Sequence, residues 1–274
     1  MESRKCMIAG LPSSGKSTYI GALWYNLCNS NEKMLMRTSS LASDISLLEK
    51  LGELWEACDK IERNSTEQNI VDDVEINLEL KDSSKTISLC VPDFWGEKFY
   101  NIIDLANTRE IEEWCEGADS LFYMVHDVRH PILIDDDKLK KITGAQEFLP
   151  PMDTKSMSPA ALNIMILKYL FDHKRFKRFV LAVTHWDEIV NDVAYPENPE
   201  EWLKSNSPAL YNFVKYYCPE VYIIGLSAQG CKYDQENFDK NAWIAKTLDG
   251  KRAFLNDADG ISYDLSKPLN FLLS

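Results

Sequence analysis

Residues 10–17 have the types and the spacing that phosphate binding requires. They read Gly10-Leu11-Pro12-Ser13-Ser14-Gly15-Lys16-Ser17, which matches the pattern G-x-x-x-x-G-K-[ST]. In this pattern the glycines let successive backbone N–H groups turn toward phosphate oxygens, the lysine reaches the terminal phosphates and the hydroxyl binds magnesium. An apolar run precedes the pattern and a proline-free stretch follows it, so we expect a strand, a loop and a helix whose N-terminus faces the anion. The residues predicted to bind a nucleotide here are Gly10, Ser13, Ser14, Gly15, Lys16, Ser17 and Thr18.

An aspartate and a glycine follow a second apolar segment, at 86–91. That segment runs into Pro92-Asp93-Phe94-Trp95-Gly96. Ligands of open α/β sheets bind beyond the carboxyl ends of the strands, so we expect Asp93 to complete a magnesium shell opposite Ser17. Gly96 lets a backbone N–H approach a γ-phosphate with no side chain in the way. A plain turn is the alternative for an isolated D-x-x-G, but after a phosphate-binding loop we favour the functional interpretation.

Two further polar segments follow apolar runs later in the chain. Thr184-His185-Trp186-Asp187 and Ser227-Ala228-Gln229-Gly230 each come directly after such a run. In this order, the four segments resemble the G1, G3, G4 and G5 boxes of the Ras-like, translation-factor-related GTPases, whose fourth box is usually N/T-K-x-D and whose fifth is S-A-K. The resemblance covers most of the chain and implies GTP or GDP, with Mg2+, as the ligand.

The fourth and fifth boxes indicate which base is bound. A carboxylate such as Asp187 accepts hydrogen bonds from the N1–H and the exocyclic amine of guanine, which adenine does not offer in that arrangement. The resemblance implies that Thr184 braces the loops and that the N–H of Ala228 meets the guanine carbonyl oxygen. His185, which would cover the base, and Gln229 stand where lysines are usual, so we expect guanine selectivity with weaker affinity. A helix N-cap and a turn are the structural alternatives for these two segments.

Sensing of the γ-phosphate in this family needs a threonine between the first helix and the strands that follow it. We predict Thr66 for that role, as a magnesium ligand whose backbone touches the γ-phosphate, with Thr38 as the alternative. Relatives often place a glutamine after the D-x-x-G glycine to orient the attacking water, whereas this chain has Glu97. A carboxylate can hold a water but repels the γ-phosphate, so we expect slow hydrolysis. The predicted catalytic residues are Lys16, Thr66, Gly96 and Glu97.

Apolar runs and helical stretches alternate along the chain. The predicted strands are 5–9, 74–80, 86–91, 120–126, 178–184 and 221–226, and the predicted helices are 16–28, 108–115, 159–173 and 200–217. Near-continuous apolar strands suit a sheet covered on both faces, and their order relative to the helices implies mostly parallel strands. The predicted fold class is therefore α/β, a P-loop NTPase three-layer αβα sandwich with a mostly parallel six-stranded sheet and one antiparallel edge strand.

The boxes are spaced more widely than a minimal fold of this kind needs. We expect one domain, 1–274, enlarged by insertions near 38–66 and 129–158 and by an extended C-terminal segment, 231–274. The first insertion has apolar residues at helical spacing, including Leu48, Leu51 and Trp55, which predicts an amphipathic helix that packs on the core. Docking of a partner is the alternative. The second insertion indicates an exposed loop beside the nucleotide, and residues 266–273 predict a short final helix.

Composition limits the classes of function. The chain carries a formal charge of −13 at pH 7, which argues against binding to nucleic acid or to an anionic membrane. Its seven cysteines contain no C-x-x-C pair and are expected to be reduced. No apolar run approaches the roughly 20 residues that span a bilayer, and a cleavable signal peptide would remove the phosphate-binding loop. We therefore expect a cytoplasmic protein with no integral membrane segment.

Among Ras-like GTPases, the sequence looks most like the uncharacterised bacterial GTPases of multi-gene, two-GTPase conflict systems. The likeness rests on the first box, on Ala22-Leu23-Trp24 after it and on Trp95 before the third-box glycine. It implies a protein effector or regulator, or a second GTPase, as partner. The expected function is a GTP/GDP switch with slow, magnesium-dependent hydrolysis. Two alternatives stay open, a catalytically weak pseudo-GTPase that acts as a nucleotide-stabilised scaffold, and an ATP-binding P-loop protein in which Asp187 is incidental.

Overall fold

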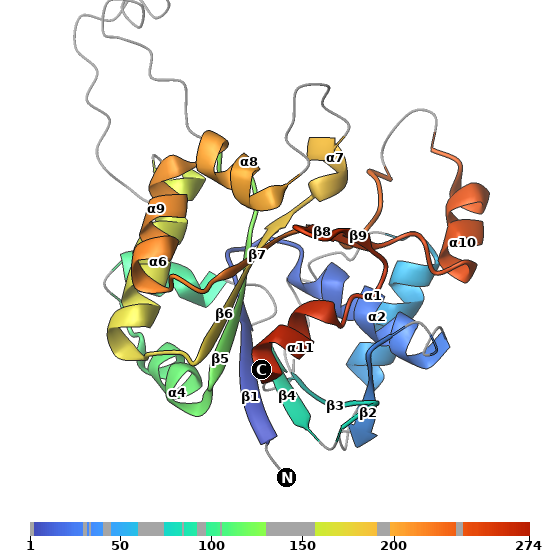
Figure 1. Ribbon diagram of the computed structural model, residues 1–274, viewed down its shortest axis with the longest axis horizontal. Helices are drawn as coiled ribbons and strands as arrows, with labels where there is room; N and C mark the ends of the chain where they lie inside the picture. Colours follow the sequence, from blue (N-terminus) through green and yellow to red (C-terminus); the bar gives the residue numbers. More distant parts are fainter. Residues whose placement is uncertain are drawn as a thin grey trace, which may run out of the picture.

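A nine-stranded mixed sheet forms the centre of the molecule (Figure 1). The structure is a computed structural model and describes residues 3–29, 32, 34–40, 45–59, 74–83, 85–91, 97–104, 106–129, 157–190, 198–233 and 238–274. The strands are β1 (Ser3–Ala9), β2 (Met36–Ser40), β3 (Val74–Leu80), β4 (Thr86–Val91), β5 (Ser120–Val125), β6 (Arg178–Thr184), β7 (Tyr222–Ser227), β8 (Phe254–Asp257) and β9 (Gly260–Ser262). They lie in the order β2-β3-β4-β1-β5-β6-β7-β8-β9.

The middle of this sheet is parallel and both of its edges are antiparallel. Strands β4, β1, β5, β6 and β7 pair in parallel, so their carboxyl ends meet at one edge. At one side β2 and β3 run antiparallel to their neighbours, and at the other side β8 and β9 do the same. The loops that carry the first, fourth and fifth boxes follow β1, β6 and β7, and therefore leave the sheet at the same edge.

Helices cover both faces of the sheet (Figure 1). One face packs against α1 (Lys16–Asn29), α2 (Ser46–Glu56) and α11 (Lys267–Leu273). The other packs against α3 (Tyr100–Ile103), which follows the 3-10 turn η2 (Glu97–Phe99), and against α4 (Arg109–Gly117), α6 (Pro159–His173), α7 (Trp186–Val190), α8 (Pro199–Asn206) and α9 (Pro208–Tyr217). Helix α10 (Lys240–Leu248) lies beyond α2 at the end of the molecule (Figure 1).

Alternating side chains of the central strands separate the two cores. On β1, Cys6 and Ile8 belong to the cluster under α1, whereas Met7 and Ala9 belong to the cluster under α4 and α6. All four side chains are fully or almost fully buried. A strand buried on both faces requires a continuous apolar sequence, and this explains why the central strands could be predicted as runs. The α/β class and the three-layer arrangement are as expected.

The number of strands was predicted wrongly, because the sheet has nine strands where six were expected. The antiparallel pairing also occurs at both edges, and not at one. The missed strands β2, β8 and β9 have the sequences Met-Arg-Thr-Ser-Ser, Phe-Leu-Asn-Asp and Gly-Ile-Ser. They lie at or next to the edges of the sheet, where a strand needs no continuous apolar run. Their short length and mixed composition therefore hid them from a search for continuous apolar strands.

Two predicted helical regions differ in detail. The stretch predicted as one helix at 200–217 is divided into α8 and α9 at Ser207, which has φ −143° and ψ 60°. Proline at 208 explains the break, because it disfavours helical backbone in the residue before it. The insertion helix forms as α2 and packs on the core, with Leu48, Leu51 and Trp55 buried. The second insertion lies, except for its first residue and its last two, outside the described residues.

Helix α2 touches α1 closely enough for backbone contact. A Cβ atom at Gly21 of α1 would lie 2.6 Å from the carbonyl oxygen of Leu51 in α2. At Gly52 of α2 a Cβ atom would lie 3.3 Å from the Trp24 ring. Glycines at both positions thus allow the insertion helix to lie directly on the helix that begins with the phosphate-binding loop. Among the described residues, no helix has the length and apolar character needed to cross a membrane.

Candidate functional site

The phosphate-binding loop connects β1 to α1 and has the backbone that its glycines permit. Gly10 and Gly15 have φ values of 154° and 89°, and Ser13 has φ 64°. A Cβ atom at Gly10 would lie 2.4 Å from the carbonyl oxygen of Met124, so no other residue fits there without movement of the backbone. The loop is thus wedged against the end of β5. Its conformation is the one that the G-x-x-x-x-G spacing predicts.

Lys16 lies across this loop and is only 3% exposed. Its Nζ donates hydrogen bonds to the carbonyl oxygens of Gly10, at 2.7 Å, and of Leu11, at 3.1 Å. The ammonium group is therefore held in place by the loop that it serves. The hydroxyl of Ser14 in the same loop is buried without a hydrogen-bond partner in the described part of the chain. A buried donor of this kind costs free energy unless a ligand satisfies it.

A second group of polar side chains lies where β6 and β7 end. The hydroxyl of Ser227 donates a hydrogen bond to Oδ1 of Asp187 at 2.6 Å and accepts one from the backbone N–H of Gly230 at 3.1 Å. Thr184 is buried and donates from Oγ1 to the carbonyl oxygen of Val125 at 3.1 Å. Burial raises the pKa of Asp187, while the Ser227 hydrogen bond lowers it. The fourth and fifth boxes, far apart in sequence, are joined through this serine–aspartate pair.

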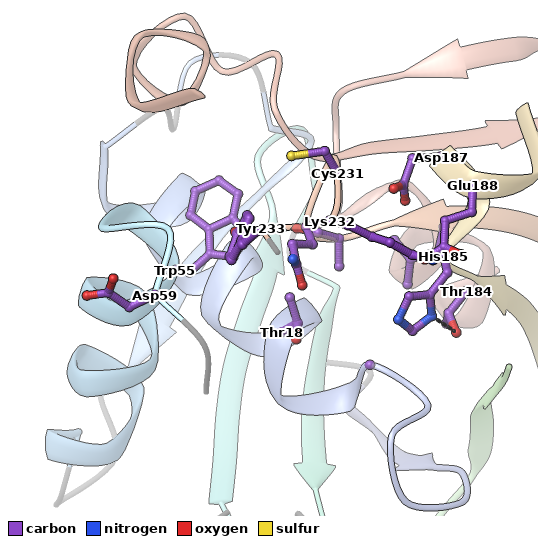
Figure 2. A pocket seen from close by; sticks show the side chains of 14 residues that line it. Thr18, Trp55, Asp59, Thr184, His185, Asp187, Glu188, Cys231, Lys232 and Tyr233 are labelled. Carbon is purple, nitrogen blue, oxygen red and sulfur yellow. Dashed lines mark hydrogen bonds and ion pairs between the residues drawn. The ribbon is translucent and has the colours of Figure 1, made fainter. Parts of the chain in front are cut away.

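One cavity of about 480 Å³ connects the two groups (Figure 2). The P-loop side contributes Gly15 and Thr18. The fourth and fifth boxes and the residues after them contribute Thr184, His185, Asp187, Glu188, Leu226, Ala228, Gln229, Cys231, Lys232 and Tyr233, and α2 and its end contribute Trp55 and Asp59. Lys232 and Glu188 form an ion pair of 2.8 Å on the cavity wall. The volume is in the range of small-molecule sites. Most of the lining side chains are polar, and the carboxylate of Asp187 is half-buried among them.

His185 lines this cavity in an unusual backbone conformation, with φ 54°. Its ring lies 3.9 Å, centroid to centroid, from the ring of His126 at the end of β5. Burial lowers the pKa of both imidazoles, and the charge of Glu188, which raises both pKa values, only partly offsets this effect. These lowered pKa values favour the neutral form of both rings. An aromatic ring stands here in place of the lysine that is usual in the fourth box.

Several predicted site residues lie outside the described residues. These are Thr66, Asp93 and Gly96, and the side chain of Glu97, which begins η2, is also not described. Strand β4, which leads to Asp93, pairs in parallel with β1 and so ends at the same edge of the sheet as the phosphate-binding loop. Thr38, the alternative switch threonine, lies in β2 opposite Leu78. It lines a separate cavity between α1 and α2 and not the one that Thr18 lines.

Seven residues that line the cavity were not predicted as site residues, namely Trp55, Asp59, Glu188, Leu226, Cys231, Lys232 and Tyr233. Arg252, which donates a hydrogen bond to the loop of the fifth box, was not predicted either. The Nε1–H of Trp55 donates to the carbonyl oxygen of Ala228 at 2.7 Å, and Nε of Arg252 donates to that of Gln229 at 3.2 Å. Trp55 was predicted as a core residue of an amphipathic helix, and no pattern separates such a tryptophan from one that also touches a ligand site. Arg252 follows the boxes in a polar segment with no motif.

Several solved structures are similar to this chain at low sequence identity. A bacterial selenocysteine-specific elongation factor EF-Sec is 14% identical, with 83% of this chain and 26% of that chain covered and a TM-score of 0.39. Elongation factor SelB from Methanococcus maripaludis, in complex with a GTP analogue, is 13% identical over 90% and 34% of the two chains, with a TM-score of 0.41. The Ski7 GTPase-like domain of S. cerevisiae, bound to GTP, is 16% identical over 87% and 46%, with a TM-score of 0.44. This chain thus spans less than half of each of these structures.

Comparison with curated proteins found no match. A family model does match, and it is described as Double-GTPase 1 and covers residues 7–272. The matched range includes the phosphate-binding loop, the serine–aspartate pair and the strands that carry them. Because the match extends over nearly the whole chain, the chain belongs to the Double-GTPase 1 family and is a GTP-binding protein.

Proposed function

We propose that the protein is a cytoplasmic GTP/GDP switch that hydrolyses GTP slowly with magnesium and regulates a protein partner. The observation that carries the proposal is the single cavity that Gly15 and Thr18 share with Asp187. A ligand that fills it touches the phosphate-binding loop at one end and the half-buried carboxylate of Asp187 at the other. Guanine offers the paired N–H donors that such a carboxylate accepts, and its phosphates belong at the loop.

We assign the phosphates to the loop that carries Lys16 and Ser14. Of this loop and the first turn of α1, Gly15 and Thr18 line the cavity, whereas Ser14 lines a separate pocket. Lys16 already lies buried against two carbonyl oxygens of the loop, so its charge is in place before a ligand arrives. A phosphate oxygen is a stronger acceptor for this ammonium group than a neutral carbonyl, because its negative charge adds an attraction between opposite charges. The unpartnered hydroxyl of Ser14 offers a further donor in the same loop. Both features favour an anion here.

The residues available for magnesium match its chemistry. Ser17, the second residue of α1, supplies a hydroxyl oxygen beside Lys16, and Asp93 and Thr66 are the carboxylate and hydroxyl that we propose as further ligands. Magnesium prefers hard oxygen ligands of these kinds. When bound, it neutralises charge on the β- and γ-phosphates. Ser17 would hold it at the N-terminus of α1, next to the phosphates that Lys16 contacts.

We propose slow hydrolysis because of Glu97. It follows Gly96 directly, where relatives use a neutral glutamine to orient water. A carboxylate can accept a hydrogen bond from the attacking water, but its charge opposes the approach of the γ-phosphate. An activating partner that supplies a positive charge would relieve this repulsion. The proposed partner is therefore a protein that binds the GTP-bound state and accelerates its hydrolysis to the GDP-bound state.

Fluorescent GTP, GDP and ATP analogues with and without magnesium test this proposal. We expect binding that prefers guanine by at least 100-fold and that tightens with magnesium, followed by phosphate release in single-turnover assays. The Glu97→Gln variant should release phosphate faster than the natural protein, and Glu116→Gln, at an exposed position of α4, serves as the matched control. Equal affinity for ATP would refute the role of Asp187. Tight guanine binding with no phosphate release at any protein concentration would refute the hydrolase.

A nucleotide-stabilised scaffold without turnover is the second candidate. The departures from the family pattern at Glu97, His185 and Gln229 favour it, since they affect the water and the base and leave the phosphate ligands intact. His185 packs on His126, and the carbonyl of Gln229 is engaged by Arg252, so both positions have structural partners. In that case GTP would raise the melting temperature of the protein and remain intact.

A further inference from the structure

The loop that carries the fifth box is held by two buried side chains from outside the boxes. Trp55 of α2 donates its Nε1–H to the carbonyl oxygen of Ala228 at 2.7 Å. Arg252, just before β8, donates from Nε to the carbonyl oxygen of Gln229 at 3.2 Å. Trp55 is 2% exposed and Arg252 is 1% exposed. Two successive peptide groups of the loop are thus fixed by groups that are more than 20 residues away in sequence.

Arg252 connects this loop to several elements at once. Its guanidinium carbon lies 4.1 Å from the centre of the Trp55 ring. The group also donates to the carbonyl oxygen of Glu56 at 3.3 Å, to Thr247 Oγ1 at 3.0 Å and to the hydroxyl of Tyr233. The acceptors in these hydrogen bonds are carbonyl and hydroxyl oxygens, which are neutral. Burying a charge is costly, so an arginine held by neutral acceptors indicates a demand for its geometry at this place.

The same contacts continue to the groups that face the ligand. Gly230 has φ 89°, and a Cβ atom there would lie 2.6 Å from the carbonyl oxygen of Arg252, so the loop backbone lies against that residue. The N–H of Gly230 donates to Ser227, whose hydroxyl donates to Asp187. Movement of the loop away from Arg252 would therefore disturb the carboxylate as well. The loop and the aspartate form one hydrogen-bonded unit.

We propose that Trp55 and Arg252 are positioning residues for guanine recognition, which hold the loop Ser227–Gly230 in the orientation that presents Ala228 and Asp187 to the base. The inference rests on the proposed function, because it specifies how the guanine end of that site is maintained. It assigns the insertion helix α2 a role in selectivity. Since α2 lies directly on α1 at Gly21, the same helix joins the guanine loop to the helix that begins at Lys16.

We call the hydrogen bonds from Trp55 and Arg252 to the loop the brace. Loosening this brace should reduce the affinity for the base alone. When only a fraction of the protein has the binding-competent loop, the apparent Kd rises in inverse proportion to that fraction. A neutral hydrogen bond contributes about 1 kcal/mol, roughly a fivefold change, and a carbonyl left unpaired adds to the loss. We therefore expect Trp55→Phe, which keeps the ring and removes the N–H, to weaken GDP binding about tenfold. Inorganic tripolyphosphate, which needs only the phosphate-binding loop, should bind as before.

The test compares Trp55→Phe and Arg252→Lys with the natural protein by calorimetry with GDP, ADP and tripolyphosphate. Trp114→Phe, in α4 on the other face of the sheet, is the matched control. Both test variants should bind GDP about tenfold more weakly than the natural protein, and their preference for GDP over ADP should be smaller. Their affinity for tripolyphosphate should stay within twofold of that of the natural protein. Amide hydrogen exchange of the nucleotide-free proteins gives a second readout. The N–H groups of residues 228–230 should exchange about tenfold faster in Trp55→Phe than in the natural protein, and at the natural rate in Trp114→Phe.

Three results would overturn the inference. GDP affinity within twofold of the natural protein in both variants would show that the brace has no role in binding. An equal loss for GDP and tripolyphosphate, with unchanged exchange at the loop, would show a general structural effect. Failure of the natural protein to prefer GDP over ADP would refute the proposed function itself, and this is read before any variant is made.

Discussion

Replacement of Asp187 by Asn is the sharpest perturbation of the guanine site. The side chain keeps its size. In the natural protein Oδ1 of Asp187 accepts a hydrogen bond from the hydroxyl of Ser227 at 2.6 Å, and the amide oxygen of Asn can accept the same bond. With the amide oxygen turned to Ser227, the amide NH2 group takes the place of the second carboxylate oxygen. Two donors of the variant then face the donors of guanine. The substitution changes the recognition of the base and keeps the connection between the boxes.

The magnitude follows from the hydrogen bonds that are lost. A hydrogen bond to a charged group contributes about 1.5–3 kcal/mol, and the carboxylate would accept two from guanine. Part of this remains, because water reaches a cavity that is open to solvent. A loss of about 3–4 kcal/mol corresponds to roughly a 100- to 1,000-fold rise in the Kd for GDP. The affinity for tripolyphosphate should not change, because Lys16 and its loop are untouched.

Fluorescence competition with GDP, ADP and xanthosine diphosphate measures the effect. Xanthine has a carbonyl where guanine has the amine, so it should bind Asp187→Asn better than it binds the natural protein. Asp249→Asn, after α10, is the control for loss of a carboxylate. If Asp187→Asn bound GDP within threefold of the natural protein, the carboxylate could not be the guanine acceptor, and the assignment of the fourth box would fail.

Two further predictions concern stability. Gly21→Ala should lower the free energy of unfolding by about 1–3 kcal/mol in denaturant titrations, because the new Cβ atom would lie 2.6 Å from a carbonyl oxygen of α2. Gly117→Ala is the control and should be neutral or slightly stabilising, because a Cβ atom there has nothing within 4 Å. Equal effects of the two substitutions would contradict the close packing of α1 on α2. The half-buried imidazoles of His126 and His185 have pKa values lowered by desolvation, so the unfolded chain binds more protons than the folded one. Their contribution to stability should be full above the unfolded pKa of about 6.5 and should fall as the pH drops below it. Thermal unfolding of the double variant His126→Gln and His185→Gln between about pH 5 and about pH 7.5 should show a weaker dependence of stability on pH than the natural protein shows. If the pH dependence of stability were unchanged, the histidine pair would not be its source.

The phosphate-binding loop and the central strands were predictable because each depends on local sequence. Gly10 and Gly15 are needed for the backbone of the loop itself, and β1 and β5 are apolar because both of their faces are buried. A pattern of neighbouring residues carries this information. The joining of Asp187 and Ser227 was also within reach of the sequence, since both follow strands that end at one edge of the sheet.

The brace on the fifth box could not be predicted in the same way. Trp55 and Ala228 are 173 residues apart, and their hydrogen bond depends on how α2 lies on α1. The strands β8 and β9, which place Arg252, have only four and three residues of mixed polarity near an edge of the sheet, so no sequence pattern identifies them. Contacts of this kind follow from the packing of whole elements. Sequence patterns identify such elements singly and do not specify how they meet.

The most direct test of guanine-nucleotide binding is a calorimetric comparison of GDP and ADP on the natural protein in magnesium. If Asp187 and the loop after β7 select the base, GDP should bind at least 100-fold more tightly than ADP, and tripolyphosphate should compete with it. Equal affinities for GDP and ADP would contradict the account at its centre.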